Sequence, residues 1–332
     1  MLDLVETDAP VATRADGRSL RRVLVWTTTP WTLVSNTALA VNPELRYVEL
    51  RRKSGDERTV LLAHSRIPAV LGDDWETRWD EVASFDGAEM AGWRYRRPLD
   101  WVTFPPDGVH EVIVAESFVS ASDGTGVVHM SPAFGADDYA AGQRNGLAFV
   151  QPVNLRGEFP QEMPLVGGLG IKSADPVIVE ELKRRDVLWK SGHAMHSYPH
   201  CWRCGTPLLQ YARTSWFVRT TSYRDAMLAR NARVDWHPPE TGTGRFGEWL
   251  TNNIDWTLSR DRYWGTPLPL WVCDAEASHV EAIGSYEQLA QRSGDALPDT
   301  FDPHKPHIDS YSWPCSEPGC RGTMLIPKRH AR

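Results

Sequence analysis

The first 130 residues alternate short apolar runs with turn-forming residues, and this pattern constrains the fold more than any other feature of the chain. Runs this short predict strands, because a helix needs about ten or more residues at regular spacing. Strands are predicted at residues 22–26, 46–50, 58–63, 110–120 and 126–130. The runs at 46–50 and 58–63 flank a turn that contains Gly55, which predicts a β-hairpin. The first part of the chain is therefore expected to be rich in β-structure.

Helical spacing starts after residue 135. One helix is predicted over residues 136–145 and ends at Gly146, because glycine readily adopts the left-handed conformation of a helix end. A second helix is predicted with Ser173 as its cap and Pro176 in its first turn. Two further helices are predicted at residues 222–231 and 246–258. This mixture of strands and helices predicts a mixed α/β fold.

Composition narrows the class of protein. The chain has 332 residues, a formal net charge of −7 and five cysteines. This length allows about two domains of roughly 150 residues, and so few cysteines exclude a disulfide scaffold. The negative charge argues against broad binding to nucleic acid, which needs many Lys and Arg contacts with phosphates, but it permits local contact with one RNA end. Neither an apolar run of ~18 residues nor a secretory signal is present, so a cytoplasmic protein that does not bind membranes is expected.

Three threonines follow the predicted strand at residues 22–26 and precede Pro30. They could continue that strand, because threonine favours β-structure. Pro30 has no N–H group to donate, so the strand must end or kink there. The alternative is that the hydroxyl groups of Thr27, Thr28 and Thr29 converge at a strand end, where they could bind a ligand. The residues by themselves leave both interpretations open.

A second candidate segment runs from Gly124 to Asp138. Gly124 and Gly126 would let the backbone approach another group closely. Asp137 and Asp138 open the following helix, whose N-terminus stabilises a carboxylate in any case. Spacing by itself favours a structural interpretation, with His129 as a half-buried strand residue and Asp138 as a helix cap.

Two longer motifs add to these segments. Residues 198–207 are Tyr-Pro-His-Cys-Trp-Arg-Cys-Gly-Thr-Pro, and residues 253–271 include Ser-Arg-Asp-Arg-Tyr-Trp-Gly-Thr-Pro. Together with the threonine and glycine segments, they closely resemble the isoleucyl-tRNA synthetase family over nearly the whole chain. Thr29 and His129 separate the chain from close relatives, because leucyl and valyl enzymes typically have Arg at the first position and Met or Lys at the second.

The resemblance implies a fragment of a class I synthetase with two domains. Residues 1–195 would form a β-barrel-rich editing domain with flanking helices. Residues 196–332 would form the second part of a nucleotide-binding, Rossmann-like catalytic domain, with a zinc-type insertion at 273–323. The His-x-Gly-His and Lys-Met-Ser-Lys-Ser motifs of the ATP site do not occur in the chain. ATP and magnesium, and hence ligase activity, are therefore expected only in the full-length parent enzyme.

The resemblance also implies a reaction, which is the hydrolysis of misacylated valyl-tRNA(Ile) at the tRNA 3′ end by a held water. The residues expected to be catalytic are Thr28, Thr29, His129 and Asp138. The Asp138 carboxylate, nine residues after His129, would bind the ammonium group of the misactivated valine. The residues expected to bind substrate are Trp26, Thr27, Trp31, Thr32, Gly126 and Asp137. The chain is expected to act as a monomer.

An alternative function stays open at this point. The chain could be a non-catalytic fragment of a split or truncated synthetase that binds a tRNA end or a partner protein. Faster release of valine than of isoleucine from charged tRNA would distinguish an editing hydrolase from such a fragment.

Cys201 and Cys204 have the Cys-x-x-Cys spacing of a zinc ligand pair. A structural zinc ion normally takes four ligands. In relatives with this pair, the partner cysteines lie upstream of the editing insertion. The resemblance therefore implies that Cys201 and Cys204 form half of a metal site.

The other three cysteines form a second group, and relatives have a fourth cysteine where this chain has Glu276. The predicted zinc ligands of this group are Cys273, Glu276, Cys315 and Cys320. Asp274 or His279 could replace Glu276 as the fourth ligand, and loss of the site is the competing interpretation.

Overall fold

The structure is a computed structural model that describes residues 1–6, 20–192, 198–259 and 266–327. The chain divides into two compact units, an N-terminal unit (Met1–Ala212) and a C-terminal unit (Arg213–Arg332). Residues 198–212 belong to the first unit, because Leu209 and Tyr211 pack against its core. The predicted boundary between editing and catalytic domains, at 195/196, concerns function and stays a prediction.

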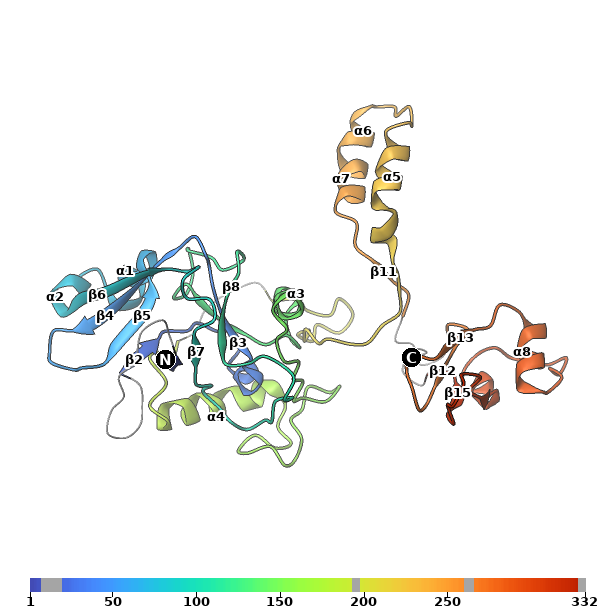
Figure 1. Cartoon of the computed structure of the whole chain (residues 1–332), viewed down its shortest axis with the longest axis horizontal. Helices are drawn as coiled ribbons and strands as arrows, with labels where there is room; N and C mark the ends of the chain where they lie inside the picture. Colours follow the sequence, from blue (N-terminus) through green and yellow to red (C-terminus); the bar gives the residue numbers. More distant parts are fainter. Residues whose placement is uncertain (7–19, 193–197, 260–265, 328–332) are drawn as a thin grey trace. The chain divides into compact units, whose positions relative to one another are not determined.

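A large mixed sheet forms the centre of the N-terminal unit (Figure 1). Its strands are β1 (Leu2–Glu6), β2 (Arg21–Val23), β3 (Ala38–Val41), β4 (Arg46–Arg52), β5 (Thr59–Ala63), β6 (Trp79–Asp86), β7 (Arg94–Tyr95), β8 (Val112–Ala115) and β9 (Val127–Met130). Their order is β6-β4-β5-β2-β1-β7-β8-β3-β9. β2 pairs with β5, and β3 with β8, in parallel; the other pairs are antiparallel.

The predicted hairpin is confirmed, because β4 and β5 pair antiparallel with Tyr47 opposite Ala63. The strands on either side of residues 122–125 do not pair with each other. Instead, β8 and β9 flank β3, which is fully buried and uses both of its edges.

One contact bears on the predicted barrel. β9 lies at one end of the strand order, yet Trp26, just after β2, bridges to Val128. The Trp26 N–H donates to the Val127 carbonyl at 3.0 Å, and the His129 N–H donates to the Trp26 carbonyl at 3.4 Å. The segment after β2 therefore meets the last strand of the sheet. The fold is mixed α/β with a large sheet, and complete closure into a barrel stays a prediction.

Helical elements connect some of these strands or follow the last of them, β9. They are η1 (Pro30–Ser35), η2 (His64–Arg66), α1 (Ile67–Leu71), α2 (Trp75–Arg78), α3 (Ala136–Asn145) and α4 (Ile171–Arg184). The prediction for α3 is confirmed, including its end at Gly146, which has a φ of 60°. The predicted start of α4 is wrong, because Gly170 is the N-cap and Ser173 already lies inside the helix. Ile171 packs against the core, and this contact favours the earlier start.

A hydrophobic cluster fixes the segment that follows the threonines. Trp31 and Leu33 of η1 pack with Ile178 and Leu182 of α4 in one buried cluster. α4 therefore holds η1 in place, and η1 in turn fixes the position of Thr27–Thr29 at its N-terminal side.

The C-terminal unit begins with a helical part. Its elements are β10 (Phe217–Val218), η3 (Thr220–Tyr223), α5 (Arg224–Asn231), α6 (Glu240–Thr243), α7 (Arg245–Thr251) and β11 (Trp256–Thr257). α5 lies beside α6 and α7 (Figure 1). The prediction of one helix over 246–258 is wrong at its end, because Trp256 pairs with Val218 as a strand residue. Asn252 and Asn253, both poor helix formers, separate α7 from that strand.

A small antiparallel sheet follows, in the order β13-β12-β15-β14. Its elements, with one helix and one 3-10 turn, are β12 (Leu270–Cys273), β13 (Val280–Ala282), α8 (Tyr286–Ser293), η4 (His307–Ser310), β14 (Trp313–Pro314) and β15 (Thr323–Leu325). Trp271 and Trp313 pack together in its core with ring centroids 5.0 Å apart. Every strand pair described in this unit is antiparallel, so its assignment to a Rossmann-like domain stays a prediction.

Among the described residues, no helix combines the length and the apolarity that crossing a membrane requires.

Candidate active site and metal centre

The threonine segment leaves the sheet after β2 and turns into η1 at Pro30, as the proline predicts. Its turn is held by its own hydroxyl groups. The Thr29 N–H donates to Thr27 Oγ1 at 3.1 Å. The Thr32 hydroxyl donates to the Thr29 carbonyl at 2.8 Å. The segment is therefore a hydrogen-bonded turn at a strand end, and it does not continue the strand.

A buried chain of side chains supports this turn from β9. Tyr95 donates to Asn36 Oδ1 at 2.6 Å. Asn36 Nδ2 lies 2.8 Å from His129 Nδ1 and can only donate, so Nδ1 is the acceptor. The proton of neutral His129 is then on Nε2, which donates to Thr32 Oγ1 at 2.9 Å. The hydroxyl of Thr29 completes the chain, 3.0 Å from Thr32 Oγ1.

This arrangement limits what His129 can do chemically. The side chain is buried, and burial lowers the pKa of His129 to about 3. Both ring nitrogens already have partners on Asn36 and Thr32. His129 therefore fixes the threonine turn, and it has no free nitrogen with which to accept a proton from a water.

Asn36 and Tyr95 are site residues that the sequence analysis missed. Asn36 is fully buried and lies, with buried Ser35 and Thr37 on either side, between the apolar residues of η1 and the apolar strand β3. A short polar run between two apolar segments was the available signal, because a buried amide must find hydrogen-bond partners.

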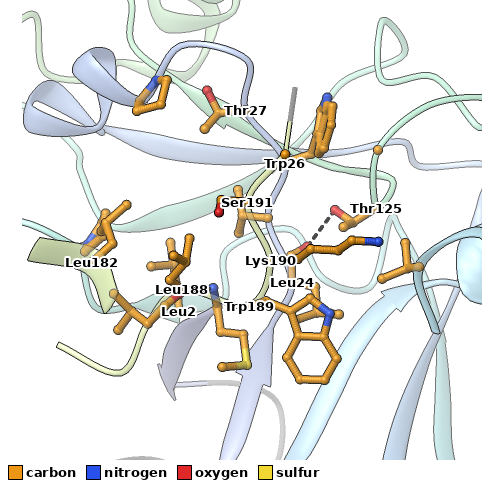
Figure 2. A pocket seen from close by; sticks show the side chains of 18 of the residues that line it. Leu2, Leu24, Trp26, Thr27, Thr125, Leu182, Leu188, Trp189, Lys190 and Ser191 are labelled. Carbon is orange, nitrogen blue, oxygen red and sulfur yellow. Dashed lines mark hydrogen bonds between the residues drawn. The ribbon is translucent and has the colours of Figure 1, made fainter. Parts of the chain in front are cut away.

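A cavity of about 590 Å³ lies beside the threonine turn (Figure 2). Trp26, Thr27 and Thr28 line it, as do apolar side chains that include Leu2, Leu24, Val70, Leu182 and Leu188. A mostly apolar cavity with a few hydroxyl groups at its edge is the usual form of a small-ligand site. Three of the predicted site residues therefore share a cavity.

Gly124 fixes the indole ring of Trp26. A Cβ atom at Gly124 would lie 2.5 Å from Cγ of Trp26, and the φ of Gly124 is +59°. Only glycine fits this position, which confirms the predicted close approach. At Gly126 the close neighbour is Ala63, and the Gly126 carbonyl accepts from the Tyr47 hydroxyl at 2.6 Å. Gly126 thus contacts other protein groups and does not line the cavity.

Asp138 lies in the first turn of α3 and points back toward the end of β9. Its Oδ2 accepts a hydrogen bond from the Ser131 N–H at 2.8 Å. Burial raises the pKa of Asp138 to about 6, with a further increase from neighbouring Asp137. Asp138 is therefore mostly ionised at pH 7, but it is not among the residues that line the cavity.

Of the remaining predicted site residues, Trp31 and Thr32 are buried and Asp137 is exposed. Trp31 is buried against Phe134, with ring centroids 4.6 Å apart, and its backbone N–H donates to Asp175 Oδ1 at 2.9 Å. Thr32 belongs to the buried hydrogen-bond chain, and Asp137 is exposed on α3.

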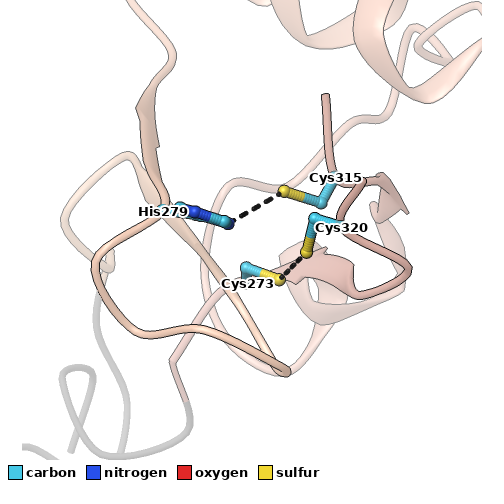
Figure 3. Close-up of side chains that lie close together, drawn as sticks. All are labelled: Cys273, His279, Cys315 and Cys320. Carbon is cyan, nitrogen blue, oxygen red and sulfur yellow. Dashed lines mark hydrogen bonds between the residues drawn. The ribbon is translucent and has the colours of Figure 1, made fainter. Parts of the chain in front are cut away.

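Four side chains of the small sheet converge on one point (Figure 3). They are Cys273, His279, Cys315 and Cys320, whose possible ligand atoms all lie within 4.8 Å of one another. The Cys273 and Cys320 sulfurs are 3.6 Å apart, and the Cys315 sulfur is 3.5 Å from His279 Nδ1. Ligand atoms around tetrahedral zinc are separated by about 3.3–3.8 Å, given zinc bonds of about 2.0–2.3 Å.

The backbone passes close to this cluster at Gly322. A Cβ atom at Gly322 would lie 2.2 Å from the Cys273 sulfur. Glu276, the predicted fourth ligand, is outside the cluster, because its Oε1 accepts from the Ser278 N–H and hydroxyl at 3.0 and 2.9 Å. The structure thus brings His279 to this place, which is one of the two alternatives to Glu276.

Cys201 and Cys204 lie in a tight turn in which Gly205 N–H donates to the Cys201 carbonyl at 2.8 Å. The Cys204 sulfur is 3.1 Å from Thr206 Oγ1. Within the described part of the chain, no third metal-binding side chain joins this pair. Its role as half of a metal site stays a prediction.

Comparison with known proteins places these features in a family. The family model described as tRNA synthetases class I (I, L, M and V) matches residues 21–300. The isoleucine–tRNA ligase of Streptomyces avermitilis is 46% identical over 323 residues, which are 97% of this chain and 29% of that protein. The isoleucine–tRNA ligase of Streptomyces coelicolor is 47% identical over 298 residues, which are 90% of this chain and 27% of that protein.

The chain therefore spans less than a third of the length of these relatives. Among solved structures, it is similar to the editing domain of the P. knowlesi cytosolic leucyl-tRNA synthetase, at 12% identity and a TM-score of 0.34. That similarity covers 50% of this chain and 80% of the other. A likeness at this level supports no conclusion about the site.

Proposed function

Because the chain belongs to the class I tRNA synthetases, we propose that it is an editing hydrolase that releases valine from valyl-tRNA(Ile). The observation that carries the proposal is the hydrogen-bonded turn of Thr27–Thr29, which a buried histidine holds against a cavity. Membership of this family indicates tRNA as the partner. The turn presents a rigid polar edge at which an aminoacyl ester could bind.

An isoleucine-specific synthetase needs such a second site. Its synthetic pocket can reject valine only through one missing methylene group, which is worth about 1–3 kcal/mol of binding free energy. Enzymes of this family are a standard example of this limit on selectivity. A second site that admits valine, excludes isoleucine and hydrolyses the ester raises the overall selectivity. We assign the rigid turn and the packed Trp26 ring to this exclusion by size.

The proposed chemistry uses a carboxylate and a water. Asp138 lies outside the cavity lining, at the end of β9, and its ionised carboxylate would attract the ammonium group of an amino acid held on that side of the threonine turn. Partial burial would strengthen this attraction. The threonine hydroxyl groups have no free base beside them, since His129 is neutral and both of its nitrogens are engaged. A water held at the turn is therefore the proposed nucleophile, with no covalent intermediate.

The proposal is tested by deacylation of purified valyl- and isoleucyl-tRNA(Ile). We expect faster release of valine than of isoleucine, and a loss of valine release of at least about tenfold in Asp138→Asn, since the charged partner of the ammonium is removed. Asp73→Asn is the matched control, because it makes the same change at an exposed position outside the cavity lining.

Equal rates for both esters, or full activity in Asp138→Asn, would overturn the proposal. Binding of the tRNA end without hydrolysis would instead support the non-catalytic fragment.

We also propose that Cys273, His279, Cys315 and Cys320 hold a structural zinc ion. Three sulfurs and one imidazole nitrogen are a common ligand set for structural zinc, and the cluster leaves no open position for a substrate. The zinc would link β12 to the segments around β14 and β15, so its contribution would be to the stability of this sheet.

A further inference from the structure

One wall of the cavity comes from a segment that the sequence analysis did not single out. Residues 187–192, which we call the strap, follow α4 and all line the cavity (Figure 2). Their neighbours across the cavity include Trp26 and Thr27, which are more than 150 residues earlier in the sequence. The strap is therefore part of the same site as the threonine turn.

The strap is anchored at several points. The Val187 N–H donates to the Leu182 carbonyl of α4 at 3.0 Å. Trp189 packs against Trp79, with ring centroids 6.1 Å apart, and the Arg52 guanidinium lies 5.7 Å from the Trp189 ring. Such contacts fix the backbone that leads to Lys190.

The cavity lining carries more positive than negative charge. Its charged side chains are Arg66, Lys190 and Asp123. Arg66 donates from Nε to the Gly124 carbonyl at 3.0 Å, so its position is fixed by the same turn that holds Trp26. Among the residues that the structure describes, neither Arg66 nor Lys190 has a carboxylate partner.

We infer that Lys190, together with Arg66, binds a backbone phosphate of the RNA end whose terminal nucleoside enters the cavity. This inference rests on the proposed function and adds to it the residues that hold the RNA. Two cations in the lining of a cavity with aromatic and apolar walls match a nucleotide, since phosphate needs positive charge and a base can stack on an indole ring. Asp123 is exposed and is the one negative group of the lining, which leaves an excess of one positive charge.

The test measures binding and catalysis separately. An RNA minihelix with the tRNA(Ile) acceptor stem and 3′ end is titrated against wild type, Lys190→Gln and Arg66→Gln at several salt concentrations. We expect each variant to bind roughly two- to fivefold more weakly, as for loss of one exposed ionic contact. The slope of log affinity against log salt should fall by about 0.7–0.9 in each variant. In deacylation of valyl-tRNA(Ile), KM should rise by a similar factor with kcat unchanged.

Lys183→Gln is the matched control, because Lys183 lies on α4 and pairs with Glu180 outside the cavity. Wild-type affinity and salt slope in Lys190→Gln would overturn the inference, as would an equal loss in Lys183→Gln. A wild-type chain that binds the minihelix through Lys190 but releases no valine would support the inference and overturn the proposed hydrolysis.

Discussion

At the scale of single residues, Tyr95, Asn36 and His129 form a directed series of hydrogen bonds that ends on the threonine turn. Each buried polar group in the series has a partner, so the series stabilises one geometry of the turn. The assignment of His129 to the catalytic residues stays a prediction, and its hydrogen bonds to Asn36 and Thr32 position the threonine turn. This positioning depends on Asn36, which lies 93 residues away in the sequence.

Asn36→Leu should lower the free energy of unfolding by at least about 2 kcal/mol, because Tyr95 and His129 would each lose a buried partner. Tyr95→Phe removes one of these bonds and should cost only about 1 kcal/mol. Urea unfolding of both variants measures the difference. If Asn36→Leu is no less stable than Tyr95→Phe, the series does not support the turn.

Asp138 should give the proposed hydrolysis a characteristic pH dependence. Its pKa is raised to about 6, so the carboxylate that binds the ammonium group forms as the pH rises through 6. We expect kcat/KM for valyl-tRNA(Ile) to fall about tenfold per pH unit well below 6 and to level off above it. This acidic limb should vanish in Asp138→Asn, and its persistence there would assign the ionisation to another group.

At the scale of elements, turns and strand register decide which residues meet. Leu39 of β3 lies opposite His129 of β9, and this register brings His129 to the turn after β2. The turn before β9 packs Gly124 against Trp26, which follows β2 and directly precedes the threonine turn.

Gly124→Ala should impair both stability and the site. The new Cβ atom would meet the Trp26 ring, and the φ of +59° is unfavourable for alanine. Gly146→Ala is the matched control, because Gly146 has a φ of +60° but nothing within 4 Å of its Cβ position. We expect Gly146→Ala to cost about 1 kcal/mol and Gly124→Ala clearly more, with a loss of valine release only in the latter. Equal effects in the two variants would show that the contact with Trp26 does not matter.

At the scale of the whole molecule, each of the two units has its own hydrophobic clusters. The candidate site lies entirely within the N-terminal unit, and the candidate metal centre lies entirely within the C-terminal unit. Loss of metal should therefore affect one unit without affecting hydrolysis in the other.

Zinc analysis of protein purified without chelator should find about one zinc per chain. His279→Ala should lose it, His279→Cys should retain it, and Glu276→Gln should behave as wild type, since Glu276 is outside the cluster. Chelation should lower the melting temperature of the C-terminal unit only, as followed by calorimetry. Retention of zinc in His279→Ala with its loss in Glu276→Gln would assign the fourth ligand to Glu276 after all.

Much of the fold could be predicted from local pattern. The β4–β5 hairpin and α3 lie where alternation, turn residues and helical spacing predict them. The end of α7 could not be predicted, because Ile254 and Leu258 continue the apolar stripe of a helix, whereas Trp256 between them pairs with Val218 as a strand residue. An apolar spacing says that a side chain can be buried, but it does not say by which partner.

The sequence by itself determined the family, the turn into η1 at Pro30 and the residue types of the site, because motifs and backbone preferences are local properties. Only the tertiary structure decided that Trp26 faces a cavity while Trp31 packs in the core, and that His279 rather than Glu276 joins the three cysteines. These outcomes depend on contacts between segments far apart in the chain. Such contacts follow from strand register and packing, which no single segment encodes.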